Sequence, residues 1–251
     1  MGIEIDFDGQ VVLVTGGTRG VGRGIAQRFA DVGATVATCA RKEVEDLPDN
    51  WTFFPADLRD GDAAWAVIDS VVEQLGQIDV LVNNAGGAPP ADTTTAPPRF
   101  SERVLALNLL AAVYCSQRAN HWMQEGEGGS IINISSVSGL RPSPTSAVYS
   151  AAKAGLVNFT MTTAMEWAPK VRVNCVSVGL IRTEQSHLFY GDEEGIARVS
   201  ATIPMGRMAE PTDVGDVCLF LASRLAAYVS GANIHVHGGG EPPPYLEAAA
   251  P

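Results

Sequence analysis

Short apolar segments alternate with longer amphipathic segments along the whole chain, and this alternation limits the fold more than any other feature of the sequence. The short segments have the length and composition of buried strands. The longer segments carry apolar residues at helical spacing, as in Trp65, Ile68, Val72 and Leu75. Because strands that alternate with helices form parallel sheets covered on both faces, we expect an α/β fold with a doubly wound parallel sheet of about seven strands.

The same pattern gives approximate bounds for each element. We expect strands at residues 10–15, 35–39, 51–55, 79–82, 129–134, 171–176 and 232–236, and helices at residues 20–32, 61–75, 101–125, 147–168 and 211–222. Residues 184–206 and the proline-rich tail at 241–251 are expected to be irregular. No linker rich in Pro, Gly or Ser and no internal repeat interrupts the pattern, so we expect a single domain spanning residues 1–251.

Composition argues against several classes of protein. The chain of 251 residues is 46% hydrophobic, which is enough for a full core. Its net charge of -11 argues against nucleic acid and anionic membranes as partners. The four cysteines form no CxxC pair and lie in apolar segments, as buried thiols do in a reducing compartment. Because neither a signal peptide nor an apolar stretch of transmembrane length is present, we expect a cytoplasmic protein.

The first expected strand runs directly into a glycine-rich turn, Thr15-Gly16-Gly17-Thr18-Arg19-Gly20-Val21-Gly22, and a helix follows. Glycine lets the backbone turn tightly and approach a ligand closely. The free N–H groups at the start of the helix suit a pyrophosphate. Three glycines alone are a weak signal, because glycine at such a turn often serves packing only. Their position after the first strand of a βαβ unit favours a dinucleotide site, although the spacing differs from the standard fingerprint.

Tyr149 and Lys153 are four residues apart in an expected helix, which places them on one face. Reduction of a ketone requires a hydride at carbon and a proton at oxygen. The pKa of a free tyrosine is about 10, too high for a good base, and a nearby ammonium lowers it by favouring the phenolate. The pair therefore predicts a proton donor and acceptor for a carbonyl substrate. The alternative, for this spacing alone, is an ordinary tyrosine and a solvated lysine on a surface helix.

Together these motifs resemble the short-chain dehydrogenase/reductase family, in its single-domain classical branch. Further matches follow in the family's order: Ala56-Asp57-Leu58, the NNAG string at residues 83–86, Asn108, Ser136, the PMGR string at residues 204–207, and Ser230-Gly231. The resemblance covers nearly the whole chain. It implies a Rossmann-type sheet and an oxidoreductase that acts on CH–OH or C=O groups of a small-molecule substrate with NAD(P). The cofactor contacts that it implies are Gly16, Thr18, Arg19, Gly20, Val21, Gly22, Arg41, Asp57, Leu58, Asn84, Ala85, Gly86, Tyr149, Lys153, Gly179, Ile181 and Thr183.

The resemblance also implies a catalytic set of Asn108, Ser136, Tyr149 and Lys153. Ser136 follows an expected strand, at the sheet edge where ligands bind, and its hydroxyl can donate to a substrate oxygen as charge develops there. The family's spacing of thirteen residues before the tyrosine selects Ser136 over its serine neighbours, and Ser138 remains a candidate for the pocket lining. Asn108 would hold a water against Lys153; the alternative is an asparagine that bridges backbone groups.

Two features depart from the family pattern or stand outside it. Val178 replaces the family's proline after the sixth strand, which puts the rigidity of that loop in doubt. His235 and His237 would share one face of the last strand, but no third ligand is visible, so we expect no metal site and interpret them as structural or interfacial.

The end of the second expected strand indicates which dinucleotide is used. An NAD enzyme places an acid there to bind the ribose 2′-hydroxyl, and that acid would repel a 2′-phosphate. Ala40 stands at this position and Arg41 follows, with Arg19 on the same side of the site and Lys42 further out. Because arginine can bind a phosphate bidentately, we expect NADP(H) to be preferred over NAD(H). The alternative is a solvated basic cluster.

Residues 184–206 carry His187, Leu188, Phe189 and Tyr190 before two glycines, a pattern that predicts a lid over a bulky apolar ketone such as a 3-oxoacyl, terpenoid or steroid-like compound. The alternative is a lid that only packs on the core. Other chemistry within the family (dehydration or epimerisation) and a non-catalytic dinucleotide sensor stay open, whereas an enoyl reductase would have a longer Tyr–Lys spacing. We expect a homotetramer or dimer built on the two long helices, which carry apolar residues beyond the needs of one core face: Leu105, Leu109, Ala112, Tyr114, Leu156, Phe159, Thr163 and Trp167.

Overall fold

The computed structural model describes residues 5–242, and its centre is one seven-stranded sheet in which all strands are parallel. The strand order is β3-β2-β1-β4-β5-β6-β7. The expected Rossmann-type α/β fold is therefore confirmed. The strands are β1 (Val11–Thr15), β2 (Thr35–Ala40), β3 (Thr52–Pro55), β4 (Val80–Asn83), β5 (Gly129–Ser136), β6 (Val171–Val178) and β7 (Asn233–Val236).

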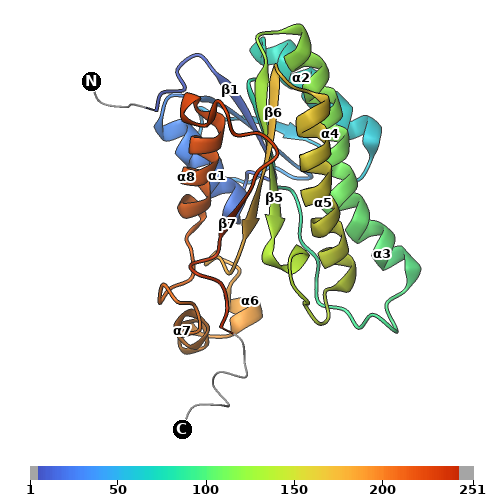
Figure 1. Ribbon diagram of the computed structural model, residues 1–251, viewed down its shortest axis with the longest axis vertical. Helices are drawn as coiled ribbons and strands as arrows, with labels where there is room; N and C mark the ends of the chain where they lie inside the picture. Colours follow the sequence, from blue (N-terminus) through green and yellow to red (C-terminus); the bar gives the residue numbers. More distant parts are fainter. Residues whose placement is uncertain (1–4, 243–251) are drawn as a thin grey trace.

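Helices cover both faces of the sheet (Figure 1). One face carries α1 (Gly20–Asp31) and α8 (Pro211–Ala222), and the other carries α2 (Gly61–Leu75), α4 (Ala111–Glu125) and α5 (Ala147–Glu166). Each face has its own apolar core. Phe29, Val36 and Val214 belong to the α1/α8 core, and Ile68, Leu81 and Met123 belong to the core on the other face. Strands β1, β4 and β5 contribute apolar side chains to both cores, which explains why consecutive positions in each of them are apolar.

The long helix expected at residues 101–125 begins earlier and is interrupted. The structure has α3 (Pro98–Leu105), a π-helical turn η1 (Ala106–Leu110), and then α4. A π turn inserts one extra residue into the helix, and such insertions often occur at functional sites. Asn108 lies in this turn.

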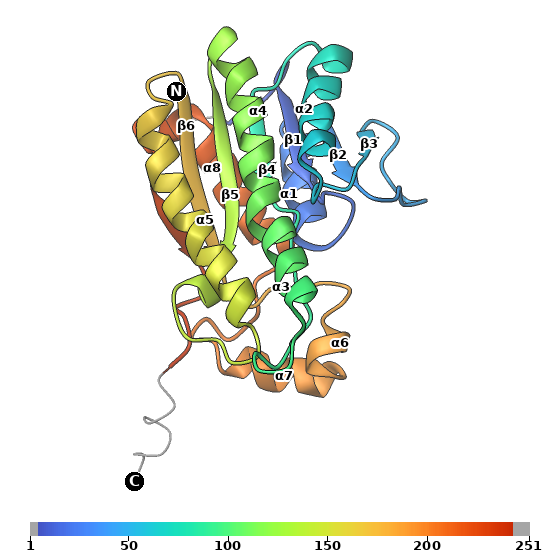
Figure 2. The ribbon, with the colours of Figure 1, turned by 90° about the vertical axis from the view of Figure 1, so that its right-hand side faces the viewer.

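The expectation of an irregular segment at residues 184–206 is wrong in part. This segment forms α6 (His187–Tyr190) and α7 (Glu193–Ala201), which lie below the sheet in Figures 1 and 2. Asp192 caps α7 by accepting a hydrogen bond from the backbone N–H of Gly195 at 3.0 Å. A small apolar cluster of Ile196, Ile203 and Met208 holds the segment together. The segment is thus built on a core of its own, separate from the two main cores.

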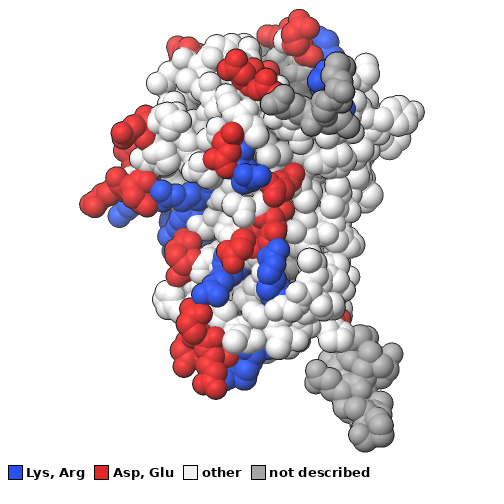
Figure 3. Space-filling model, turned by 90° about the vertical axis from the view of Figure 1, so that its left-hand side faces the viewer, with Lys and Arg blue, Asp and Glu red and all other residues white. Residues whose placement is uncertain are grey.

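Acidic and basic side chains lie close together on the face that carries α1 and α8 (Figure 3). Arg28 on α1, for example, pairs with Asp216 on α8 at 2.6 Å. Within the described residues, no helix has both the length and the apolar character needed to cross a membrane. The tail is described only as far as Pro242, so most of the proline-rich string lies outside the described residues.

Candidate active site

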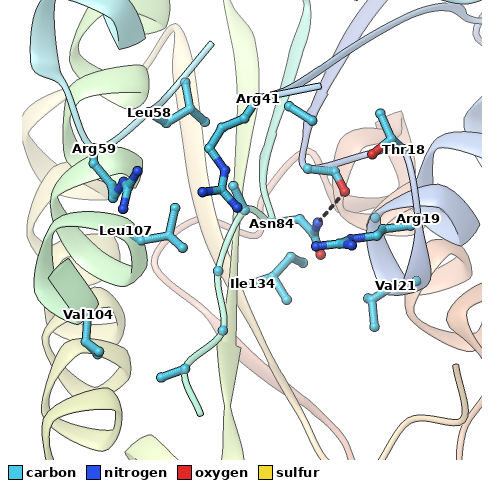
Figure 4. A pocket seen from close by; sticks show the side chains of 18 of the residues that line it. Thr18, Arg19, Val21, Arg41, Leu58, Arg59, Asn84, Val104, Leu107 and Ile134 are labelled. Carbon is cyan, nitrogen blue, oxygen red and sulfur yellow. Dashed lines mark hydrogen bonds between the residues drawn. The ribbon is translucent and has the colours of Figure 1, made fainter. Parts of the chain in front are cut away.

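The largest cavity, of about 610 Å³, opens at the carboxyl ends of β1, β2, β4 and β5. Chain connections leave in opposite directions from β1 and β4, and ligands of open α/β sheets bind at such a switch point. Figure 4 shows the cavity between the glycine-rich turn on one side and the π-helical turn on the other. Most of the expected cofactor residues line it: Gly16, Thr18, Arg19, Gly20, Val21, Gly22, Arg41, Asp57, Leu58, Asn84, Ala85, Gly86, Tyr149, Lys153 and Thr183.

The glycine-rich turn has the geometry of an anion site. Gly16 and Gly20 have positive φ values of 64° and 53°, which favour glycine over other residues. At Gly22, a Cβ would lie 2.3 Å from the Nδ2 atom of Asn84, so only glycine fits there. Helix α1 begins without a side-chain cap, and its first N–H groups are therefore available to a ligand.

Thr15 fastens this turn to the NNAG segment. Its Oγ1 accepts hydrogen bonds from the backbone N–H groups of Asn84 and Ala85, both at 3.0 Å. The Asn84 side chain in turn donates to the carbonyl of Thr15 at 2.9 Å. Sequence reasoning gave Thr15 no role of its own, although its place directly before the glycines was a usable signal. The two cofactor segments are thus held as one rigid unit.

A third arginine, which sequence reasoning missed, lies at the far end of the cavity. Arg59 donates from Nε to Asp57 at 2.8 Å and also pairs with the second carboxylate oxygen. The hydrogen bonds from Arg59 hold the pKa of the Asp57 carboxyl below its usual value. Both oxygens of the expected adenine-contacting acid are therefore already engaged. Arg19 and Arg41 are exposed, and Figure 4 shows their side chains extending toward the middle of the cavity from different elements.

The catalytic candidates converge at the ends of β5 and α5. Ser136 is the last residue of β5, and Tyr149 and Lys153 lie in the first two turns of α5. Lys153 is 4% exposed, and its Nζ donates to the carbonyl of Ile134 at 2.8 Å. The same Nζ lies 5.7 Å from the centre of the Tyr149 ring. The spacing of four residues therefore brings the tyrosine and lysine side chains together, rather than leaving the lysine in solvent.

The pKa of the Tyr149 hydroxyl is raised, which is opposite to the direction expected from the sequence. Burial is the main cause, because it disfavours the phenolate, and hydrogen bonding with Ser136 offsets it in part. Burial also lowers the pKa of Lys153 from 10.5 to about 8. The ammonium that was expected to stabilise the phenolate is itself held in a poorly solvated place. In this structure Tyr149 is therefore a neutral hydroxyl that can donate a proton.

Asn108 lies beside Lys153 but is tied to the backbone. Its side chain accepts from the N–H of Gly87 at 2.7 Å and donates to the carbonyl of Val104 at 2.9 Å. A Cβ at Gly86 would lie 2.8 Å from Asn108 Oδ1 and 3.3 Å from Lys153 Nζ. Both polar atoms therefore face the same point of the backbone. The geometry agrees with the backbone-bridging alternative and also places Asn108 near the lysine.

The segment after β6 lacks the family's proline, and pairing with the neighbouring strands holds it instead. Val178 pairs with Ser136 on one side and with Val236 on the other, so β6 runs two residues further than expected. The Gly179 N–H donates to the carbonyl of Val236 at 2.9 Å, and a Cβ at Gly179 would lie 2.8 Å from that of His237. These pairings hold the start of the loop to the sheet without the proline.

Of the remaining cofactor candidates, two lie away from the main cavity. Ile181 pairs with Ala209 and packs on the α1/α8 core, and Gly179 lines a second cavity. Thr183 lies across the main cavity, with its Cγ2 3.7 Å from a Cβ built at Gly20.

His235 on β7 and His237, which directly follows β7, lie close together, with ring centroids 5.4 Å apart. Among residues 5–242, no group of three or more His, Cys, Asp or Glu side chains is placed to hold a metal ion.

Comparison with known proteins gives matches over nearly the whole chain. The sequence profile of the family described as enoyl-(acyl carrier protein) reductase matches residues 16–241. A 3-oxoacyl-[acyl-carrier-protein] reductase of Thermotoga maritima is 35% identical over 93% of this chain and 98% of its own length. A 3alpha-hydroxysteroid dehydrogenase of Mediterraneibacter gnavus is 35% identical over 91% of this chain and 96% of its own. The ligand-free aldohexose dehydrogenase of Thermoplasma acidophilum superposes with a TM-score of 0.87 at 30% identity, covering 98% of this chain and 96% of its own.

Proposed function

The chain belongs to the short-chain dehydrogenase/reductase family, whose members are oxidoreductases acting on alcohol or ketone groups with NAD(P), and we propose that it is an NADP(H)-dependent carbonyl reductase or alcohol dehydrogenase. One observation carries the proposal: Ser136, Tyr149 and Lys153 meet at the sheet edge, beside a cavity lined by the glycine-rich turn. Either direction of hydride transfer is compatible with this arrangement.

The residues of the cavity fit a dinucleotide. The uncapped start of α1 and the close approach at Gly22 suit the pyrophosphate, and Asp57 and Leu58 line the end where the adenosine would lie. Arg19 and Arg41 line the cavity and can bind a 2′-phosphate, and at Ala40 no acidic side chain is present to repel it. Both features support NADP(H). When bound, the nicotinamide cofactor supplies or accepts the hydride.

The chain's own residues handle the proton and the substrate oxygen. The Tyr149 hydroxyl, kept neutral by burial, donates its proton to the carbonyl oxygen in the reductive direction. The Ser136 hydroxyl donates a hydrogen bond to the same oxygen as negative charge develops there. Lys153 is held beside Tyr149 by its bond to Ile134, where its positive charge favours the tyrosinate that proton donation leaves behind. Asn108 positions the backbone against which Lys153 packs.

Three alternatives make different demands on these residues. An enoyl reductase, the activity named by the family description, would have a longer Tyr–Lys spacing than the four residues found here. A dehydratase or epimerase of the same family keeps the site but gives no net change of the nicotinamide. A dinucleotide sensor has no need for all of Ser136, Tyr149 and Lys153, so their joint presence favours an enzyme.

For the substrate we favour a fairly bulky ketone with an apolar body. The apolar side chains of α6 are exposed, with Leu188 at 67% and Phe189 at 61%, as in a lid that has not closed over a ligand. The names of the oxoacyl and hydroxysteroid relatives agree with an apolar body, whereas the aldohexose dehydrogenase is named for a polar one. The small cluster of Ile196, Ile203 and Met208 supports the alternative that the segment partly packs on itself.

We also propose a homodimer or homotetramer that assembles through the helices of the α4/α5 face. Part of the apolar surplus expected there is buried in the chain's own core, namely Ala112, Leu156 and Thr163. The side chains that remain exposed are others: Leu110, Met161 and Met165. The four free, buried cysteines support a reducing compartment such as the cytoplasm.

The test of this function is nicotinamide absorbance with matched substrates. The wild-type chain is incubated with NADPH and, in separate reactions, with saturated ketones and α,β-unsaturated acyl compounds of equal length. We expect oxidation of NADPH with ketones only. Turnover of the unsaturated compounds alone would favour the enoyl reductase, and cofactor binding without turnover of any compound would favour the sensor.

A further inference from the structure

A second cavity, of about 410 Å³, is lined by the segment that directly follows the catalytic serine. Ser135 lines the first cavity and Val137 the second, so Ser136 stands in the chain between lining residues of the two. The same division occurs on the neighbouring strand, where Val178 lines the first cavity and Gly179 the second. A substrate whose carbonyl is at Ser136, with the cofactor in the first cavity, therefore has the second cavity for the rest of its body.

The wall of this second cavity combines apolar residues with a few polar and charged ones. Five apolar residues line it, and the polar lining consists of two histidines and one pair of opposite charges. The volume is within the range of small-molecule sites. The apolar residues are Val137, Leu140, Leu180, Ile203 and Pro242, and the polar ones are Arg141, His235, His237 and Glu241.

Arg141 is fixed in an orientation that presents one end of its guanidinium to an anion. Its Nη1 donates to the carbonyl of Pro142 at 3.0 Å and to the hydroxyl of Ser143 at 2.8 Å. Its Nη2 donates to a carboxylate oxygen of Glu241. The local contacts thus hold the guanidinium in place, while its outer edge binds a carboxylate. Arginine recognises carboxylates in this way in many ligand sites.

The carboxylate that fills this place comes from the segment after β7. Glu241 follows Gly238, Gly239 and Gly240, which all have positive φ values. This glycine segment lies against the end of the lid, where the N–H of Met205 donates to the carbonyl of Gly238 at 3.1 Å. The side chains of Arg141 and Glu241 are 40% and 38% exposed, and ion pairs that are this exposed contribute little to stability.

The charge of Glu241 also acts on a side chain of the lid. Burial and, to a smaller extent, the negative charge of Glu241 raise the pKa of the Tyr190 hydroxyl on α6. Glu241 therefore lies near the lid as well as near Arg141. If another anion displaced the Glu241 carboxylate, the surroundings of both Tyr190 on the lid and Arg141 on the second cavity would change.

We propose that Arg141 binds a carboxylate of the substrate, and that Glu241 occupies this place as an internal ligand until the substrate displaces it. The inference rests on the proposed function and names the substrate class for that site: an oxo acid or hydroxy acid in which an apolar chain separates the reacting carbon from the carboxylate. The apolar wall between Ser136 and Arg141 accommodates the chain, and the arginine fixes its far end. Substrate binding then replaces one exposed ion pair by another, with little net electrostatic cost.

The first experiment compares a straight-chain oxo acid with its methyl ester, which lacks the charge and carries one added methyl group at the far end. With the wild-type chain and NADPH, kcat/KM for the acid should exceed that for the ester at least tenfold. In Arg141→Gln the ratio of acid to ester should fall to about one. The matched control is Arg198→Gln, because Arg198 is an exposed arginine that pairs with Glu194 on α7 and lines neither cavity. It should keep the wild-type ratio.

The second experiment measures binding without turnover. Calorimetry with octanoate and with octanamide, a neutral analogue of equal length, should give tighter binding of octanoate by about tenfold. Arg141→Gln should remove this difference, and Glu241→Gln should tighten octanoate binding severalfold by removing the internal competitor. Equal binding of the two compounds, or a preference for octanoate that survives Arg141→Gln, would overturn the inference.

The two experiments separate the inference from the proposed function. If octanoate binds through Arg141 but no ketone is reduced, the proposed function fails and the carboxylate site stands. If ketones are reduced but the ester is as good a substrate as the acid, the function stands and the carboxylate site fails.

Discussion

The Nζ of Lys153 lies over the Tyr149 ring, 5.7 Å from its centre. A hydrogen bond of 2.8 Å to the carbonyl of Ile134 keeps it there. The lysine is thus anchored to β5, and its charge acts on the tyrosine from a fixed position inside the protein. This arrangement lowers the stability of the folded chain, because an ammonium buried in this way is poorly solvated.

Because burial of the Lys153 ammonium costs free energy, we expect that replacing Lys153 stabilises the fold. Burial lowers the pKa of Lys153 from 10.5 to about 8 in the folded chain. Since one pKa unit corresponds to about 1.4 kcal/mol, the buried ammonium costs ~3 kcal/mol at neutral pH. Lys153→Met keeps the volume without the charge, so it should raise the free energy of unfolding at pH 7 while it abolishes turnover. Chemical denaturation with activity assays checks both effects.

The same substitution should show its pH dependence with a defined sign. Below pH 8 the lysine is protonated in both the folded and the unfolded chain, so the difference between variant and wild type is greatest there. Between pH 8 and 10.5 only the unfolded chain holds the proton, so the wild type gains stability with pH and the difference shrinks. The exposed Lys42 provides the control Lys42→Met, which should follow the wild-type curve. A difference that does not change with pH would contradict burial as the cause.

Gly86 should not tolerate a side chain, although it is exposed at the cavity. The added methyl group of Gly86→Ala would press on Asn108 Oδ1 and on Lys153 Nζ. We expect kcat/KM to fall on the order of 100-fold, since small displacements of catalytic groups have effects of that size. Gly61→Ala is the control, because its methyl group would meet only Tyr114, at 3.4 Å. Wild-type activity in a folded Gly86→Ala chain would show that catalysis does not depend on the close approach of Asn108 and Lys153 to Gly86.

Cofactor preference should depend on the end of β2. Arg41→Ala removes a guanidinium from the cavity and should raise KM for NADPH much more than KM for NADH. Ala40→Asp restores the acid that binds a ribose 2′-hydroxyl and should shift the preference toward NADH. Lys42→Ala removes a neighbouring charge that does not line the cavity, and it should have the smallest effect. The ratio of kcat/KM with NADPH and NADH checks all three, and a wild-type ratio in favour of NADH would refute the proposed preference.

Assembly should be sensitive to the exposed methionines of α5. Met161 and Met165 are one helical turn apart and are 45% and 84% exposed. The double variant Met161→Glu/Met165→Glu places charges on this face, and light scattering should then find a smaller particle than the wild type. Met205→Glu changes another exposed methionine, in the segment after α7, and should leave the mass unchanged. A wild-type chain that is a monomer at micromolar concentration would count against the assembly itself.

The sheet and its helices could be predicted from the sequence because each carries a local signal. Each strand carries apolar residues within a short segment, and α2 and α8 were expected with the bounds that the structure has. Helices α6 and α7 were missed because they are short, contain or adjoin glycines, and depend on contacts of Ile196 with residues later in the chain. The local signals available for α7 were its cap Asp192, the acidic Glu193 and Glu194 in its first turn, and Arg198 in its last turn.

The site could be predicted as a set of positions but not as a set of interactions. Motif spacing brought Tyr149 and Lys153 together correctly, yet the direction of the tyrosine's pKa shift depends on burial, which the sequence does not display. The π-helical turn around Asn108 has no sequence signature in an otherwise ordinary helix. Arg141 and Glu241 are 100 residues apart, and only the tertiary fold brings them together.

The central claim is that Tyr149 supplies the proton for carbonyl reduction, and the variant Tyr149→Phe tests it most directly. The measurement is the rate of NADPH oxidation with a ketone that the wild-type chain reduces, at saturating cofactor. Phenylalanine keeps the ring beside Lys153 and removes only the hydroxyl, so cofactor binding should remain close to that of the wild type. The account predicts a loss of turnover on the order of 100-fold to 10,000-fold, the usual contribution of a positioned proton donor. A Tyr149→Phe chain that reduces the ketone at the wild-type rate would contradict it.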